Sequence, residues 1–201
     1  MEPNLTEPPQ VDLEQIDGFA RVRLRWRDLI AFLKARGDSS ANRITYFEGV
    51  LELMSPSVNH ESIKKNLARL IEAWSTECEI DLRGFGSWTL KSSRSKTAVE
   101  PDECYILGPR GRRQTPDIAI EVKWTTGGIE KLEVYKCLGV REVWLWERAQ
   151  LVPYLLKAGH YARARRSSVV PELDFSLLSR FSTREDQLQA TKSFLAASRG
   201  H

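Results

Sequence analysis

The segment 116–124, PDIAIEVKW, constrains the fold more than any other stretch of this sequence. Its apolar residues predict a strand in the interior of a sheet, yet it also carries two acids and a lysine. Because side chains alternate along a strand, Asp117, Glu121 and Lys123 share one face, while the aliphatic residues between them point to the other. Charged groups are costly in a central strand unless they have a partner or a metal, so this face is expected to carry chemistry.

The preceding strand offers a partner for Glu121. We expect residues 102–107 to pair antiparallel with residues 116–123 around the polar loop GPRGRRQT. Symmetric closure of this loop, with its first residue opposite its last, places Asp102 directly across from Glu121. Opposed side chains lie roughly 4.5 to 5.5 Å apart at Cβ. A slip of one residue would send Asp102 to the other face, so the predicted site depends on this register.

Two carboxylates at this spacing repel each other unless a cation lies between them. Their hard oxygen atoms favour Mg²⁺ or Mn²⁺, so Asp102 and Glu121 are predicted to be metal ligands and catalytic residues. Lys123, one pleat along on the same face, is predicted to stabilise developing charge or to orient the attacking water. The reaction implied is phosphodiester hydrolysis. The structural alternatives are an aspartate that opens its strand beside a turn, and a glutamate and lysine that pair at a sheet edge.

These residues resemble a known pattern, the PD-(D/E)xK nuclease signature, through Pro101 and Asp102, the intervening hairpin, and Glu121 to Lys123. The blocks YFEGVLELMSPSVNHESI, TPDIAIEV and EKLEVYKCLGVREVWLWE resemble, in order over about residues 40–150, the Uma-type restriction endonuclease family. The family's pattern of lysine, tyrosine, glycine-valine, glutamate and tryptophan is matched by Lys131, Tyr135, Gly139, Val140, Glu142 and Trp144.

The resemblance implies a fold, a cofactor and a partner. The fold is an α/β (α+β) restriction-endonuclease-like core with a mixed central β-sheet flanked by helices. The cofactor is Mg²⁺ or Mn²⁺ and the partner is DNA, cut by a homodimer because nucleases of this fold cleave the two strands as pairs. Members are mostly bacterial. We expect residues 1–20 to form a poorly ordered N-terminal arm and residues 21–201 to form a single domain.

This chain departs from the family pattern after Glu121. Members commonly continue with a serine-rich run, whereas this chain has KWTTGG. Because of this departure, either Lys123 or Lys131 could be the lysine that acts in catalysis. Strand alternation favours Lys123, whereas Lys131 requires its helix to lean toward the site. It also leaves open a second function, a module that binds nucleic acid or dimerises on the same fold without turnover.

Several further residues are candidates for the site or for DNA contact. Glu52, His60 and Glu61 are candidates for additional site groups, although an acid at the start of a helix is also explained by the positive helix end. Asp117 follows a proline and is expected to serve in the turn. Candidates for sequence-independent, salt-sensitive phosphate contacts are Lys64, Lys65, Arg112, Arg113 and the run YARARR at 161–166.

Apolar periodicity predicts the elements around the hairpin. Helices are expected within RLRWRDLIAFLKARG, within VNHESIKKNLARLIEAWSTEC, within TTGGIEKLEVYKCLG ending at Gly139, and within REDQLQATKSFLAAS, capped through Thr183 and Asp186. Strands are expected in RITYFEGVLELMSPS, which turns at Glu48 and Gly49, and in GFGSWTLKSS, REVWLWER and LVPYLL. Strands with helices before and after them predict a mixed sheet.

The amino-acid composition narrows the classes of protein to which the chain can belong. The 30 basic and 27 acidic residues give a net charge of +3, which permits nucleic-acid binding without arguing for it. Three widely spaced cysteines without a CxxC pair argue against a disulfide framework and a structural zinc site. The first residues lack a basic, apolar signal segment, and no apolar run approaches the length of a membrane span. A soluble protein of the cytoplasm, without a membrane partner, is expected.

Overall fold

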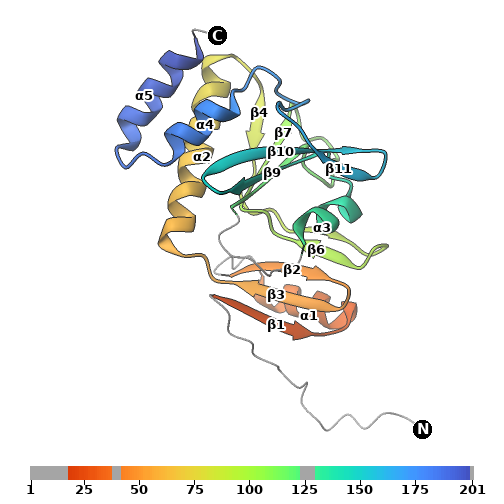
Figure 1. The fold of residues 1–201 in the computed structure, drawn as a ribbon. Coiled ribbons are helices and arrows are strands. Elements are labelled where there is room, and N and C mark those ends of the chain that lie inside the picture. Colours follow the sequence, from red (N-terminus) through yellow and green to blue (C-terminus); the bar gives the residue numbers. More distant parts are fainter. Residues whose placement is uncertain (1–17, 38–41, 123–129, 200–201) are drawn as a thin grey trace, which may run out of the picture.

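Two β-sheets and the helices packed on them form the described part of the chain, which comprises residues 18–37, 42–122 and 130–199 of a computed structural model (Figure 1). One sheet has five strands in the order β1-β3-β2-β6-β5, and the other has six in the order β11-β10-β9-β8-β7-β4. The chain passes from the first sheet to the second through α2 (Val58–Glu77). It returns for β5 (Leu90–Ser92) and β6 (Thr97–Val99) before it completes the second sheet.

The five-stranded sheet is antiparallel and packs against α1 (Trp26–Arg36). Its remaining strands are β1 (Phe19–Arg23), β2 (Arg43–Phe47) and β3 (Val50–Met54). The predicted hairpin of β2 and β3 is confirmed, and it turns at Glu48 and Gly49, whose φ angles of 49° and 82° are both left-handed. Two consecutive positive φ angles match the turn that suits the twist of a two-residue hairpin.

The six-stranded sheet contains the predicted central hairpin. Its strands are β4 (Leu82–Gly84), β7 (Glu103–Leu107), β8 (Ile118–Val122), β9 (Glu142–Glu147), β10 (Gln150–Lys157) and β11 (His160–Arg163). Strand β8 runs parallel to β9 and antiparallel to β7, so the sheet is mixed as predicted. The ladder pairs Glu103 with Ile120, which is the predicted register. Asp102 directly precedes β7, and its N–H donates to the carbonyl of Ile120 at 3.1 Å.

Helices cover both faces of the six-stranded sheet. One face packs against α2, α4 (Phe175–Ser182) and α5 (Gln187–Ser198), and the other against α3 (Lys131–Leu138) (Figure 1). Ile118, Ile120 and Val122 belong to the first apolar cluster, and Ala119 belongs to the second. The predicted alternation of β8 is therefore confirmed, and Glu121 lies on the face covered by α3.

Some elements differ from the sequence prediction. Strands β1, β4, β6 and β11 and helix α4 were not predicted, and Phe19 and Ala20, assigned to the N-terminal arm, begin β1. The predicted cap of α5 at Thr183 is wrong, because Thr183 ends α4. Asp186 caps α5 and accepts from the N–H of Gln189 at 2.9 Å. No helix in the described ranges has the length and apolarity that a membrane crossing requires.

A buried carboxylate on β9 holds the segment before α4. Glu142 is 0% exposed and accepts from Trp144 Nε1 at 3.0 Å and from Ser167 Oγ at 2.7 Å. It also accepts from the N–H of Ser168 at 2.6 Å and of Val169 at 3.0 Å. These donors satisfy the buried charge of Glu142. The presence of Glu142 and Trp144 in the family pattern is therefore explained by their structural contacts.

Candidate active site

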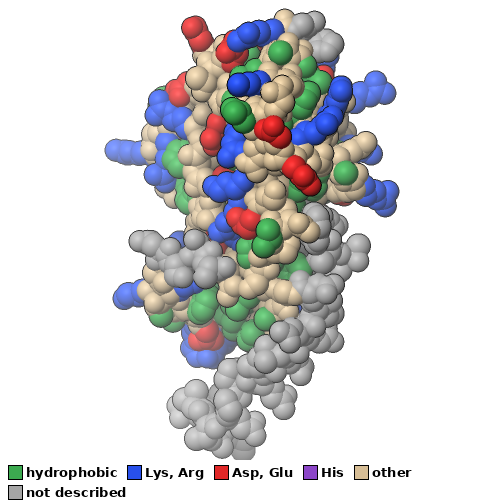
Figure 2. Space-filling model, turned by 90° about the vertical axis from the view of Figure 1, so that its left-hand side faces the viewer, with side chains coloured by type: hydrophobic (Ala, Val, Ile, Leu, Met, Phe, Trp, Pro, Cys, Tyr) green, Lys and Arg blue, Asp and Glu red, His purple; other side chains and the backbone are tan. Residues whose placement is uncertain are grey.

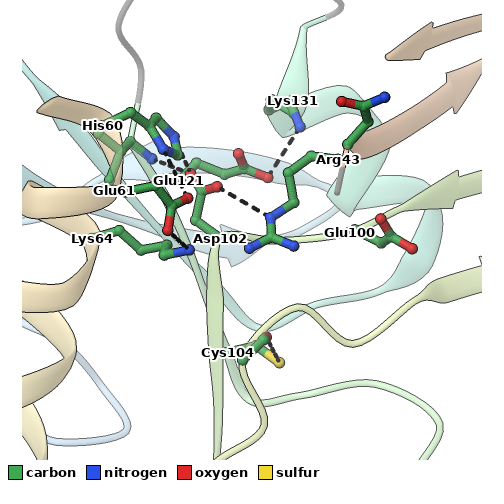
Figure 3. Close-up of polar contacts among 12 residues, drawn as sticks. Arg43, His60, Glu61, Lys64, Glu100, Asp102, Cys104, Glu121 and Lys131 are labelled. Atoms are coloured by element: carbon green, nitrogen blue, oxygen red, sulfur yellow. Dashed lines mark hydrogen bonds and ion pairs between the residues drawn. The ribbon is translucent and has the colours of Figure 1, made fainter. Parts of the chain in front are cut away.

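Asp102 is buried at the junction of β7, β8 and α2. It is 1% exposed, and its Oδ2 accepts from the N–H of Val122 at 2.8 Å and contacts Nε2 of His60 at 3.0 Å. Its Oδ1 is buried without a hydrogen bond and lies 3.9 Å from Nε of Arg43 (Figure 3). One oxygen of this carboxylate is thus fixed by two contacts, and the other is left without a donor.

Glu121 is held from α3. It is 5% exposed, and its Oε1 accepts from the hydroxyl of Tyr135 at 2.5 Å and from Nζ of Lys131 at 3.2 Å. Lys131 is the first residue of α3. Its contact with Glu121 shows that α3 leans toward the site, which is the orientation that a role for Lys131 requires. Lys123, which strand alternation favoured, lies outside the described residues.

The predicted pair of acids is brought together. Figure 3 shows the carboxylates of Asp102 and Glu121 pointing into one region, with Lys131 on one side and His60 on the other. The negative charge of Asp102 raises the pKa of Glu121, which also places the two groups within electrostatic range. Asp102 and Glu121 are therefore two neighbouring buried carboxylates, as the predicted register requires.

Burial and neighbouring charges set the ionisation of the site in opposite directions. Burial favours a raised pKa for Asp102, but the hydrogen bond and charge of His60, together with the Val122 N–H and the charge of Lys131, outweigh it, so the pKa of Asp102 lies below its usual value. Burial favours a lowered pKa for His60, but the hydrogen bond and charge of Asp102, with the charges of Glu61 and Glu121, outweigh it, and the pKa of His60 is raised. The pKa of Glu121 is raised chiefly by burial, against the opposing charge of Lys131.

The start of α2 contributes two predicted candidates. Ser57 caps the helix by accepting from the N–H of His60 at 3.3 Å, so the side chains of His60 and Glu61 are left for the site. Oε1 of Glu61 is buried without a hydrogen bond and lies 3.7 Å from Nδ1 of His60. Oε2 of Glu61 lies 2.5 Å from Nζ of Lys64. Lys64 is 4% exposed, unlike the solvated lysine expected from the sequence, because it faces the site, whereas Lys65 is exposed.

The remaining predicted residues lie elsewhere or have structural partners. Glu52 is in β3 of the other sheet, where its Oε2 accepts from Nε of Arg21 at 3.0 Å. Asp117 accepts from Arg113 at 2.5 Å, from Arg141 at 3.2 Å and from the N–H of Leu107 at 3.0 Å.

These contacts give Asp117 the predicted turn role. They also pair Arg113, a candidate for phosphate contact, with a carboxylate, although Arg113 and Arg112 are both exposed.

Two neighbours of the carboxylates had no assigned role in the sequence prediction. Tyr135 lies four residues after Lys131, which is about one helical turn. The helical period therefore indicated that both side chains lie on the same side of the helix and can contact the same carboxylate, Glu121. Arg43 opens β2 in the other sheet and is 8% exposed. Its approach to Asp102 depends on how the two sheets meet, and no local pattern carries that information.

The donor set fits a hard divalent cation. The described residues contain no group of three or more His, Cys, Asp or Glu side chains placed to hold a metal ion. Mg²⁺, however, keeps several water ligands and uses one or two carboxylates. Asp102, with a buried oxygen that lacks a hydrogen bond, and the adjacent Glu121 supply that number.

Comparisons with known proteins identify the fold and the family of the chain. No curated protein matches the chain. The crystal structure of a "putative nuclease belonging to DUF820" from Anabaena variabilis matches with a TM-score of 0.56 at 17% identity, covering 83% of this chain and 98% of that chain. At this identity the match shows a shared fold, and the predicted restriction-endonuclease-like fold is confirmed. The sequence profile of the Uma2 family, described as "Putative restriction endonuclease", matches residues 29–183, so the chain belongs to the Uma2 family.

Proposed function

We propose that the chain is a metal-dependent endonuclease that hydrolyses DNA phosphodiester bonds, with Asp102 and Glu121 as metal ligands. The observation that carries the proposal is the pair of buried carboxylates on adjacent strands, one of which keeps an oxygen without a hydrogen bond. Oδ1 of Asp102 accepts no hydrogen bond and lies 3.9 Å from the guanidinium of Arg43, and a bound cation would stabilise this buried carboxylate further. Membership of the Uma2 family supports nuclease activity.

Neighbouring groups prepare Asp102 for this role. His60 and the N–H of Val122 occupy Oδ2, which leaves Oδ1 for the ion. The lowered pKa of Asp102 keeps its carboxylate ionised at neutral pH. A bound Mg²⁺ or Mn²⁺ supplies positive charge that lowers the pKa of a bound water and neutralises a phosphate oxygen.

We assign the charge-stabilising lysine to Lys131. Its ammonium lies 3.2 Å from Oε1 of Glu121 and is partly exposed, so a substrate phosphate can reach it. Loss of one preorganised donor typically lowers the rate by about 10²-fold or more. We expect Lys131→Ala to reduce cleavage by that order and Lys123→Ala to reduce it far less. The opposite ranking in single-turnover assays would assign the role to Lys123.

Plasmid cleavage tests the carboxylate assignment. Pure protein is incubated with plasmid in Mg²⁺ or Mn²⁺, beside Asp102→Asn and Glu121→Gln. Both variants are expected to lose cleavage, because each removes a charged ligand of the ion. Glu133→Gln is the matched control, since Glu133 is an exposed carboxylate on α3 that pairs with Lys136. Cleavage that survives in both site variants would remove the assignment.

We further propose that the active form is a homodimer, because cutting both strands of a duplex requires two sites. Sedimentation velocity over a range of protein concentrations tests this form. A monomer at all concentrations, combined with double-strand cleavage, would contradict it.

The second candidate function is a DNA-binding module without turnover. It is favoured by the absence, within the described residues, of a three-ligand group of His, Cys, Asp or Glu side chains placed for a metal. Calorimetric titration with Mn²⁺ separates the two functions. The nuclease requires a stoichiometric site that Glu121→Ala abolishes, whereas the module requires none.

A further inference from the structure

An arginine-lined groove lies beside the sheet, separate from the two carboxylates. It has a volume of about 960 Å³ and lies between the start of β10, the end of β11 and α4. Its charged side chains are Arg163, Arg165, Arg180 and Arg184, and hydroxyl groups of Ser176 and Thr183 lie among them. All four arginines are exposed. We call this feature the arginine groove.

The positive charge of the arginine groove is not neutralised by ion pairs. Within the described ranges, none of its four guanidinium groups pairs with a carboxylate. The nearby Asp174 and Asp186 cap α4 and α5 and accept from backbone N–H groups. Glu185, next to Arg184 in the sequence, and Glu172 are further exposed acids of this region. The groove therefore offers an anion several guanidinium groups that are not paired with carboxylates, although that of Arg180 lies over the ring of Phe181 at 5.5 Å.

The strand register relates the arginine groove to Glu121 across the sheet, although the groove is bounded by α4 and the carboxylate of Glu121 lies on the face covered by α3. Glu121 on β8 pairs with Leu145 on β9, and Leu145 pairs with Val152 on β10, which lines the groove. Neighbouring strands lie about 4.8 Å apart, so the backbones of Glu121 and Val152 are separated by about 10 Å across the sheet. The turn of β9 and β10 lies on the left of Figure 1, and Figure 2 views that side, where Lys and Arg side chains are spread over the upper part with acidic ones between them.

We propose that the arginine groove binds backbone phosphates of the DNA duplex, an inference that takes its ligand from the proposed nuclease function. Guanidinium groups bind phosphate through two parallel hydrogen bonds, and serine and threonine hydroxyls add further contacts. Phosphates along one strand are spaced about 3.4 Å along the helix axis, so a groove lined by four arginines can contact more than one of them. Such contacts position the duplex without reading its sequence.

Charge reversal in the arginine groove tests the proposal. The groove variant combines Arg163→Glu with Arg180→Glu. The control combines Arg83→Glu with Arg199→Glu, which changes the net charge equally but alters arginines already paired with Asp81 and Glu77. A fluorescent 20-base-pair duplex is titrated in EDTA, so that no cleavage interferes, and anisotropy is measured across a range of salt concentrations. Circular dichroism verifies folding.

The groove variant is expected to raise the duplex Kd at least tenfold and to lower the slope of log affinity against log salt by about 2, one for each lost phosphate contact. The control is expected to change Kd by less than about threefold, because its arginines contact no phosphate. The neutral pair Arg163→Gln with Arg180→Gln is expected to lie between the wild type and the groove variant. Equal Kd values for the groove and control variants, or no duplex binding by the wild type, would overturn the proposal. Failure of the nuclease function appears separately, as a wild type that binds the duplex and does not cleave in Mg²⁺ or Mn²⁺.

Discussion

At the residue scale, the site depends on which oxygen of Asp102 is occupied. His60 and the Val122 N–H both lie on Oδ2, so the carboxylate is held in one orientation while Oδ1 stays without a hydrogen bond. His60 is itself 2% exposed and lies between Asp102 and Glu61. Partners that orient a ligand in this way commonly affect metal affinity as strongly as a weak ligand does.

Substitution of His60 tests this orienting contact. His60→Ala is expected to weaken Mn²⁺ affinity by about 10- to 100-fold, because the carboxylate loses a partner that orients it. His60→Gln is expected to retain most of the affinity, since its amide N–H₂ reaches a position close to that of imidazole Nε2. Calorimetry with Mn²⁺ measures both. Equal affinities for His60→Ala and the wild type would show that Asp102 needs no such partner.

A second residue-scale prediction concerns Glu142. Glu142→Ala leaves several buried donors without an acceptor, so the free energy of unfolding should fall by about 3 kcal/mol or more. Glu147→Ala on the same strand is the control, because Glu147 accepts one 3.3 Å hydrogen bond from Tyr154 and is partly exposed. It is expected to cost about 1 kcal/mol or less. Urea denaturation compares the variants, and similar losses in both would contradict the anchoring role of Glu142.

At the element scale, the short helix α3 decides which lysine enters the site. Its first residue contacts Glu121, and its last turn ends at Gly139, which has a left-handed φ of 71°. The sequence predicted this end, because a glycine after an apolar helix is a common stop. It did not predict the lean of the helix, since that depends on Val134 and Tyr135 packing against distant strands.

The cap of α3 gives an element-scale prediction. Gly139→Ala places a Cβ in left-handed backbone and should lower the free energy of unfolding by about 1 kcal/mol. Gly139→Asn should cost less, because asparagine tolerates this conformation better than alanine. No atom lies within 4 Å of an added Cβ at this position, so backbone strain and not a clash is the cause. Thermal denaturation that ranks alanine above asparagine would contradict this reasoning.

The β7–β8 hairpin shows what sequence reasoning can reach. Its register follows from side-chain alternation and loop length, both of which are local, and the pairing of Glu103 with Ile120 confirms it. Strands β4 and β11 were missed because they have three and four residues, too few for an alternating pattern. The burial of Lys64 was missed for a different reason, since a lysine on a helix is ordinarily solvated unless an acid such as Glu61 binds it.

At the scale of the whole molecule, the candidate site lies where the two sheets meet. Arg43 comes from the five-stranded sheet, Asp102 from the six-stranded sheet and His60 from the helix that connects them. The sequence predicted one mixed sheet, because no local pattern distinguishes strands of one sheet from strands of another. Cys104, two residues after Asp102, is fully buried, and its thiol donates to the carbonyl of Gly86 at 3.3 Å.

Cysteine reactivity reports on this packing. Cys104 is 0% exposed, and burial raises the pKa of its thiol to about 12, so it should resist thiol reagents in the native protein. Cys78 and Cys137 are exposed and should react. Maleimide labelling followed by peptide mass spectrometry is expected to find Cys104 modified only after unfolding. Rapid native labelling of Cys104 would contradict the packing around β7.

The central claim is that Asp102 and Glu121 hold one divalent cation. Crystals grown with Mn²⁺ and measured at an energy where manganese scatters anomalously test this claim most directly. The account predicts one anomalous peak bound by Oδ1 of Asp102 and a carboxylate oxygen of Glu121, absent from crystals of Glu121→Gln. A map without a peak between these two carboxylates, or a peak that persists in Glu121→Gln, would contradict it.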